Sequence, residues 1–151
     1  FSPTPIESAT KEEWLTLLDT NATVPLLLIK SLKPLLEDSK GCVINISDSE
    51  VDSGIPEYSL YAAAKAAIES LTKSLAKELA PNVRINAIAP GIILWPEDGV
   101  LDEEKKAEII NKTALGRDGE PDDIASATYL LYRSTYMTGQ VLKIDGGRSP
   151  G

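Results

Sequence analysis

Residues 58–91, YSLYAAAKAAIESLTKSLAKELAPNVRINAIAPG, decide the fold class because a long helical pattern is followed directly by a strand pattern. Apolar residues recur every three or four positions over 58–80, which predicts an amphipathic helix that packs on a sheet. The apolar stripe consists of Leu60, Ala64, Ile68, Leu71, Leu75 and Leu79. Pro81 should end this helix, and residues 83–89, VRINAIA, predict a strand that ends at Pro90-Gly91.

The flanking sequence continues the alternation of helices and strands. TKEE begins at Thr10 with capping-box spacing to Glu13, which predicts a helix start, and Pro25 and Pro34 should kink or break that helix. Further helices are expected at 102–112 and 122–132, and further strands at 42–47 (CVINIS) and 140–144. Because helices separate the strands, the sequence predicts an α/β fold with a parallel sheet.

Composition excludes several classes of function. The 151 residues are enough for about one domain, and 15 basic against 23 acidic side chains give a charge of −8, which disfavours nucleic acid and anionic membranes. With no histidine and the single cysteine Cys42, the chain lacks imidazole catalysis and the usual zinc ligands, so no metal is expected. The longest apolar run, residues 24–29, predicts no membrane span, and we expect a reducing, cytoplasmic location.

Tyr61 and Lys65 are the first candidates for catalysis. They lie four residues apart and therefore share one face of the predicted helix. An ammonium beside a phenol should lower the pKa of the phenol from about 10, which would make Tyr61 an acid or base that needs no histidine. A pair with this spacing is also common on helix surfaces without any function.

Asp48 and Asn21 are further candidates. Asp48 follows the predicted strand 42–47, at the carboxyl end where open α/β sheets bind ligands, although it could simply begin a turn. Pro25 has no N–H for the carbonyl of Asn21, so that carbonyl could hold an ordered water. The alternative for Asn21 is a helix that is kinked for structural reasons alone.

Taken together, these residues resemble the short-chain dehydrogenase/reductases. The matching features follow in order: Asn21, a strand-end residue thirteen before Tyr61, Tyr61-x-x-x-Lys65, Pro90-Gly91, LGRDGEPDDIA (115–125) and TGQVLKIDGG (138–147). Most members have serine where this chain has Asp48, and the Asp-Tyr-Lys set, with FSPTP (1–5) and APGIILWPE (89–97), is similar to the pteridine reductases. A shift of one residue would instead place Ser49 there and suggest an ordinary carbonyl reductase.

The resemblance implies a Rossmann-like doubly wound parallel sheet, NADPH as cofactor, and a pterin or folate substrate. Tyr61 would donate the proton, Lys65 would bind the nicotinamide ribose, Asp48 would orient the pterin and Asn21 would hold a relay water. The implied cofactor-binding residues are Ile46, Ser47, Tyr61, Lys65, Pro90, Gly91, Ile92 and Ile93. The implied substrate-binding residues are Phe1, Asp48, Tyr61, Leu94, Trp95 and Pro96.

The glycine-rich dinucleotide motif of that family is not among the ten glycines of this chain. The resemblance therefore implies that residues 1–151 are the carboxyl-terminal part of one domain, with about three strands and an N-terminal half elsewhere. We expect the open edge of strand 42–47 to make the isolated chain unstable as a monomer. The resemblance also implies dimers or tetramers formed through helix 58–80, with Arg148 reaching a neighbouring subunit. Two alternatives remain: a general carbonyl or 3-oxoacyl-thioester reductase, and a non-catalytic interaction remnant.

Overall fold

The computed structural model describes residues 3–95 and 102–149 and contains a three-stranded parallel sheet with the order β1-β2-β3. The strands are β1 (Cys42–Ile46), β2 (Arg84–Pro90) and β3 (Val141–Ile144). In the register, Cys42 lies opposite Arg84 and Ala87 lies opposite Val141. The predicted α/β fold with parallel strands is confirmed, and all carboxyl ends of the strands lie at one edge of the sheet.

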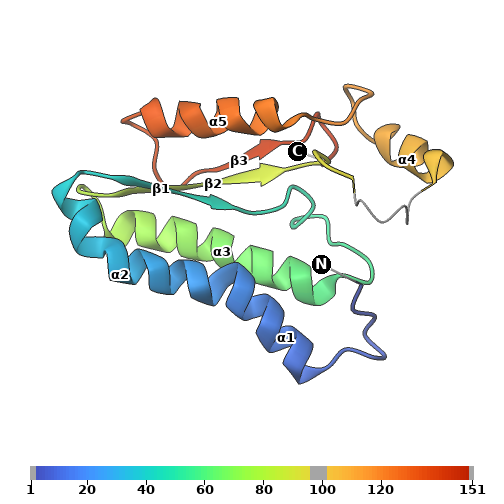
Figure 1. Cartoon of the computed structure of the whole chain (residues 1–151), viewed down its shortest axis with the longest axis horizontal. Coiled ribbons are helices and arrows are strands. Elements are labelled where there is room, and N and C mark those ends of the chain that lie inside the picture. The colour runs from blue at the N-terminus through green and yellow to red at the C-terminus, as the bar shows by residue number, and fades with distance from the viewer. Residues whose placement is uncertain (1–2, 96–101, 150–151) are drawn as a thin grey trace.

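Helices cover both faces of the sheet, as a doubly wound fold requires (Figure 1). α3 (Ser59–Glu78) lies on one face with α1 (Lys11–Leu18) and α2 (Val24–Asp38), and α5 (Pro121–Arg133) lies on the other. The short helix α4 (Glu103–Ile110) lies beyond the carboxyl ends of the strands. One core cluster joins α2 and α3 to the sheet, and a second joins β2 to α5. Their buried members are Ile29, Ala76, Leu79, Val83 and Ile85 in the first, and Ile88, Ala127 and Leu131 in the second.

The first helical segment begins where the capping box predicts. The Thr10 hydroxyl accepts a hydrogen bond from the Glu13 backbone N–H, and the Glu13 carboxylate accepts one from the Thr10 backbone. Between α1 and α2 the chain forms a π-helix, η1 (Asp19–Thr23), in which Val24 N–H donates to the Asp19 carbonyl. Pro25 follows this wider turn. Pro34 lies inside α2, which continues to Asp38, so of the expected kink or break the break does not occur at Pro34.

The buried face of α3 differs from the predicted apolar stripe. Ala64, Ile68 and Leu79 are buried as expected, whereas Leu60, Leu71 and Leu75 are only partly buried. The buried face also includes Tyr61, Glu69, Thr72 and Ala76. Three of these four side chains are polar, and the apolar pattern missed them because they are buried through hydrogen bonds to β1 and the residues that follow it.

Apolar side chains of α2 remain open to solvent in this chain, including Val24, Leu28 and Leu35. By length and composition, the helical run Lys11–Asp38 is the one described segment that could cross a membrane, although the sequence analysis expected none. The run is long and apolar enough because apolar residues continue on both sides of Pro25 and Pro34. A helix that packs in the core of a protein can have the same length and composition, so these two properties do not place this run in a membrane.

Candidate functional site

The centre of the candidate site is a hydrogen bond between Tyr61, in the first turn of α3, and Asp48, just after β1. The Tyr61 hydroxyl donates to Asp48 Oδ2 at 3.0 Å, and Glu50 N–H donates to Asp48 Oδ1 at 2.9 Å. The backbone turn thus fixes one carboxylate oxygen while the other faces the phenol. Asp48 is thus the strand-end residue hydrogen-bonded to Tyr61, whereas Ser49 N–H pairs with the Pro90 carbonyl and the buried Ser49 hydroxyl makes no hydrogen bond among the described residues.

The environment of Tyr61 raises the pKa of its phenol well above the ordinary value. Burial is the largest cause, followed by the negative charge of Asp48 and the hydrogen bond to it. The pKa of the Tyr61 phenol is therefore raised and not lowered as predicted, because burial and the adjacent Asp48 carboxylate both act in that direction. Tyr61 is consequently a phenol that stays protonated at neutral pH, which suits a proton donor.

Lys65 lies one turn further along the same face of α3. Its Nζ donates to the Ile46 carbonyl at 3.0 Å and lies 5.7 Å from the centre of the Tyr61 ring. Burial lowers the pKa of Lys65, and the charge of Asp48 opposes that shift. The ammonium is thus held against the last residue of β1, at the end of the sheet where a cofactor is expected.

Two of the predicted cofactor-binding residues, Ile46 and Ser47, form hydrogen bonds to side chains of α3. The Ile46 carbonyl accepts from Lys65, while its side chain is 49% exposed. The Ser47 hydroxyl is buried and donates to Glu69 on α3. The Ser47 hydroxyl is therefore engaged within the chain, and the role of Ser47 in binding a cofactor stays a prediction.

Asn21 lies in η1, which packs against α3. Its side-chain amide donates to the Leu17 carbonyl at 2.9 Å, so the amide is turned back along its own helix. The π-helical turn agrees with the expectation that Pro25 disturbs the backbone around Asn21. Its role in holding a water stays a prediction.

The segment Pro90–Ile93 leaves the carboxyl end of β2 beside β3. Gly91 N–H donates to the Ile144 carbonyl at 2.9 Å, and a Cβ on Gly91 would lie only 2.7 Å from the Cα of Asp145. Glycine is therefore required here by close packing of the backbone. Ile92 follows, and its carbonyl accepts from Gly119 N–H at 2.8 Å.

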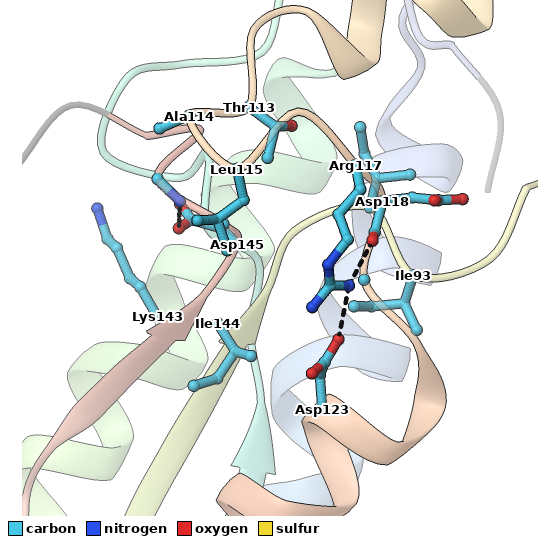
Figure 2. A pocket seen from close by; sticks show the side chains of 14 residues that line it. Ile93, Thr113, Ala114, Leu115, Arg117, Asp118, Asp123, Lys143, Ile144 and Asp145 are labelled. Carbon is cyan, nitrogen blue, oxygen red and sulfur yellow. Dashed lines mark hydrogen bonds and ion pairs between the residues drawn. The ribbon is translucent and has the colours of Figure 1, made fainter.

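A cavity of about 400 Å³ opens at this end of β2 and β3 (Figure 2). Its lining includes Ile93, Arg117, Asp123, Lys143 and Asp145. Figure 2 shows Arg117 reaching the Asp118 carbonyl and the Asp123 carboxylate, at 2.8 and 3.2 Å. Asp48, Tyr61 and Lys65 do not line this cavity, although the predicted cofactor-binding residues Ile92 and Ile93 do.

The predicted substrate-binding residues are only partly described. Leu94 is 77% exposed, and the Trp95 indole N–H donates to Asp118 at 2.9 Å, which ties that ring to the loop before α5. Phe1 and Pro96 lie outside the described residues, so their predicted roles stay predictions.

Sequence reasoning missed two contacts beside the site. Glu69 accepts from Ser47, and its spacing of four and eight residues from Lys65 and Tyr61 could have indicated the shared face. Arg148 pairs with Glu50 in the same chain, with a 3.2 Å hydrogen bond to Oε2, and reaches the Ile109 carbonyl. Arg148 is thus held by groups of its own chain, and its reach toward a neighbouring subunit stays a prediction.

Comparison with known proteins agrees with this geometry. Residues 1–149 match a family model described as "Enoyl-(Acyl carrier protein) reductase". The chain is 38% identical over 141 residues to a 3-oxoacyl-[acyl-carrier-protein] reductase FabG of Chlamydia muridarum, covering 91% of this chain and 57% of the relative. It is 37% identical over 150 residues to a 3-alpha-(or 20-beta)-hydroxysteroid dehydrogenase of Mycobacterium tuberculosis, covering 97% and 56%.

A solved structure of a 4-hydroxyisoleucine dehydrogenase mutant complexed with NADH and succinate is similar in fold. It superposes with a TM-score of 0.90 at 30% identity, covering 98% of this chain and 64% of that chain. The chain therefore spans a little over half the length of the curated relatives it matches. The match covers the sheet, α3 and the Tyr61-Lys65 face together.

Proposed function

The chain belongs to the short-chain dehydrogenase/reductase family, and from that premise we propose that its protein is a nicotinamide-dependent reductase in which Tyr61 donates the proton. The observation that carries this proposal is the buried Tyr61 phenol, held by Asp48 at 3.0 Å with Lys65 one helical turn away. A phenol with a raised pKa is protonated at neutral pH and can deliver its proton as negative charge develops on the substrate.

The residues at the carboxyl end of β1 fit a nicotinamide cofactor. An ammonium has three donors, and the Ile46 carbonyl takes one from Lys65, so the others can reach ribose hydroxyls. The Pro90–Ile93 segment would run beside the nicotinamide. When bound, the cofactor supplies the hydride. We propose NADPH because the sequence resembles the pteridine reductases; direct titration with NADPH and NADH decides between the two.

A carbonyl compound, in particular a 3-oxoacyl thioester, is the substrate class that the relatives favour. The two curated relatives above are by name a 3-oxoacyl reductase and a hydroxysteroid dehydrogenase, and neither is named for a pterin. On a ketone, Tyr61 would protonate the oxygen that hydride addition turns into an alkoxide. Lys65 would hold the cofactor beside it, and Asn21 is proposed to hold the relay water.

A pterin is the second candidate, and Asp48 is the observation that favours it. Reduction of a ring C=N needs a proton on nitrogen, and a carboxyl group beside a phenol can share one with the ring. Asp48 would then contact substrate directly, and Phe1 and Trp95 would flank the ring. Reduction of a simple ketone needs no proton on nitrogen, so a carboxylate at this position would have no comparable role.

The experiment is an assay of the full-length protein with NADPH or NADH against three substrate classes: a 3-oxoacyl thioester, a hydroxysteroid ketone and a dihydropterin. Turnover of the thioester or ketone supports the first candidate. Turnover of the dihydropterin that falls steeply in Asp48→Ala supports the second. Failure to bind either nicotinamide would contradict the reductase proposal and favour a non-catalytic interaction protein.

We further propose a cytoplasmic location, a dimer or tetramer formed through α3 and its neighbour, and additional chain covering the outer edge of β1. The single cysteine supports the proposed location. The described surface supports the added chain and the self-association: β1 is an edge strand, and the outer face of α2 is apolar. Purified residues 1–151 should self-associate or melt without cooperativity. A cooperative, monomeric melt would contradict this.

A further inference from the structure

Glu69 is a buried carboxylate to which the proposed reaction gives no task. It lies on α3 with 8% of its surface exposed, and its Oε1 accepts a hydrogen bond from the hydroxyl of Ser47, which is 4% exposed. The oxygen–oxygen distance is 2.6 Å, in the range of a charge-assisted hydrogen bond. Burial of a carboxylate is costly, so a bond of this kind is needed to keep it in place.

Three successive turns of α3 hold three neighbouring residues at the end of β1. Tyr61 donates to Asp48, Lys65 donates to the Ile46 carbonyl, and Glu69 accepts from Ser47. The contacts come from positions i, i+4 and i+8 of one helix face. Glu69 therefore completes a set of contacts whose other two members are the proposed catalytic residues.

Two different elements hold Ser47: one binds its backbone N–H and the other binds its side-chain hydroxyl. Its N–H donates to the Ile88 carbonyl of β2 at 2.7 Å, and its hydroxyl donates to Glu69 of α3. Asp48 follows immediately, so the direction in which its carboxylate leaves the strand depends on both ties.

We propose that Glu69 is a positioning residue, which acts through Ser47 to hold Asp48 and the Tyr61 hydroxyl in the arrangement that the reaction needs. The expected effect on turnover rests on the proposed function. The claim that Glu69 fixes the position of Asp48 through Ser47 does not depend on it. Displacement of a reacting group by about 1 Å can cost on the order of 10²-fold in rate, so an indirect tie of this kind has a measurable effect.

A neighbouring contact provides a matched control. Asn45, two residues before Ser47 on the same face of β1, donates to the hydroxyl of Thr72 on α3 at 2.9 Å. This pair is also buried and also joins β1 to α3, but it lies further from Asp48 along the strand. Thr72→Val should therefore affect stability without changing turnover.

The test compares Glu69→Leu, Ser47→Ala, their double variant, Glu69→Gln and Thr72→Val in the full-length protein. Glu69→Leu and Ser47→Ala should each lower kcat about 10-fold with little change in KM, and the double variant should be no worse than either. Glu69→Gln keeps the acceptor for Ser47 and should recover most of kcat. Independent effects of the two single variants, or an equal loss in Thr72→Val, would overturn the proposal.

A crystal structure of Glu69→Leu, or of Ser47→Ala if the first does not fold, gives a readout without activity. We expect the Asp48–Tyr61 hydrogen bond to be lost or displaced in the variant. An unchanged distance overturns the positioning role. If the wild-type protein reduces none of the three substrate classes, the proposed function fails, and this structural comparison still decides the role of Glu69.

Discussion

The carboxyl ends of β1 and β3 lie at the same edge of the sheet but differ in how their charges are arranged. After β1, Asp48 faces a buried phenol, and Lys65 donates to a carbonyl. Around β3, Lys143 pairs with Asp52 at 3.0 Å and Arg117 pairs with Asp123 at 3.2 Å. The charged side chains near β3 therefore mostly form ion pairs with one another, whereas the Asp48 carboxylate after β1 shifts the pKa of the Tyr61 hydroxyl.

The pKa directions agree with this difference. Burial and Asp48 raise the pKa of Tyr61, and burial lowers the pKa of Lys65. The surroundings therefore shift the pKa of both proposed catalytic residues. Near β3, burial raises the pKa of Asp145, but hydrogen bonds from Ser149 and Gly147 outweigh it and leave the pKa lowered. A carboxylate stabilised in this way is suited to structure, and the difference supports the proposal that the chemistry lies at β1.

The largest expected effect is the loss of the Tyr61 hydroxyl. Tyr61→Phe keeps the ring but removes the proton, and kcat should fall about 10²–10⁴-fold in the full-length enzyme. Lys143→Met, in the cavity at β3, is the matched control and should leave kcat within about twofold. Steady-state kinetics with the best substrate, together with nicotinamide binding by fluorescence, provide the measurement. Full turnover in Tyr61→Phe would remove this residue as the donor.

The next effect is a shift in pH dependence. Tyr61 donates only while protonated, so activity is lost as the pH rises through its pKa, and the charge of Asp48 moves that loss to higher pH. Asp48→Asn removes the charge while burial remains, so the alkaline limb of kcat/KM should move to lower pH. Asp52→Asn, an exposed carboxylate that pairs with Lys143, should leave the profile in place. A profile for Asp48→Asn that matches the wild type would contradict the assigned cause.

The two ends of the sheet also show how far sequence reasoning reaches. Periodicity and turn residues were sufficient to predict the strands and helices, because these elements depend on local patterns. The alternation of helices and strands was sufficient to predict that the strands are parallel. The family resemblance, and not spacing alone, predicted that Asp48 lies beside Tyr61, and the structure has the two side chains hydrogen-bonded. The direction of the Tyr61 pKa and the use of Ser47 by Glu69 could not be predicted, because they depend on which polar groups are buried together. For the same reason the apolar stripe of α3 missed Thr72.

A smaller effect on stability is expected where β2 passes β3. Gly91→Ala would place a methyl group 2.7 Å from the Cα of Asp145, and the backbone there cannot yield without disturbing the sheet. We expect a loss of about 1–3 kcal/mol in the free energy of unfolding. Gly41→Ala is the control, because its nearest neighbour is the tip of the Leu36 side chain at 3.0 Å, which can move. Denaturant titration of both variants measures the difference, and equal losses would mean that the close approach at Gly91 is relieved elsewhere.

The smallest effect is expected at Arg117, and it tests the distinction between the two ends of the sheet most directly. Its partner Asp123 is partly exposed, and the pKa of Asp123 is lowered first by the backbone N–H of Glu120 and only then by Arg117. Because that backbone bond remains in Arg117→Gln, the start of α5 should be retained and kcat should stay within about twofold. Thermal melting and kinetics of this variant are the measurement. A loss of turnover comparable to that of Tyr61→Phe would mean that the cavity at β3 takes part in the reaction, and that paired charges there do not mark a structural region.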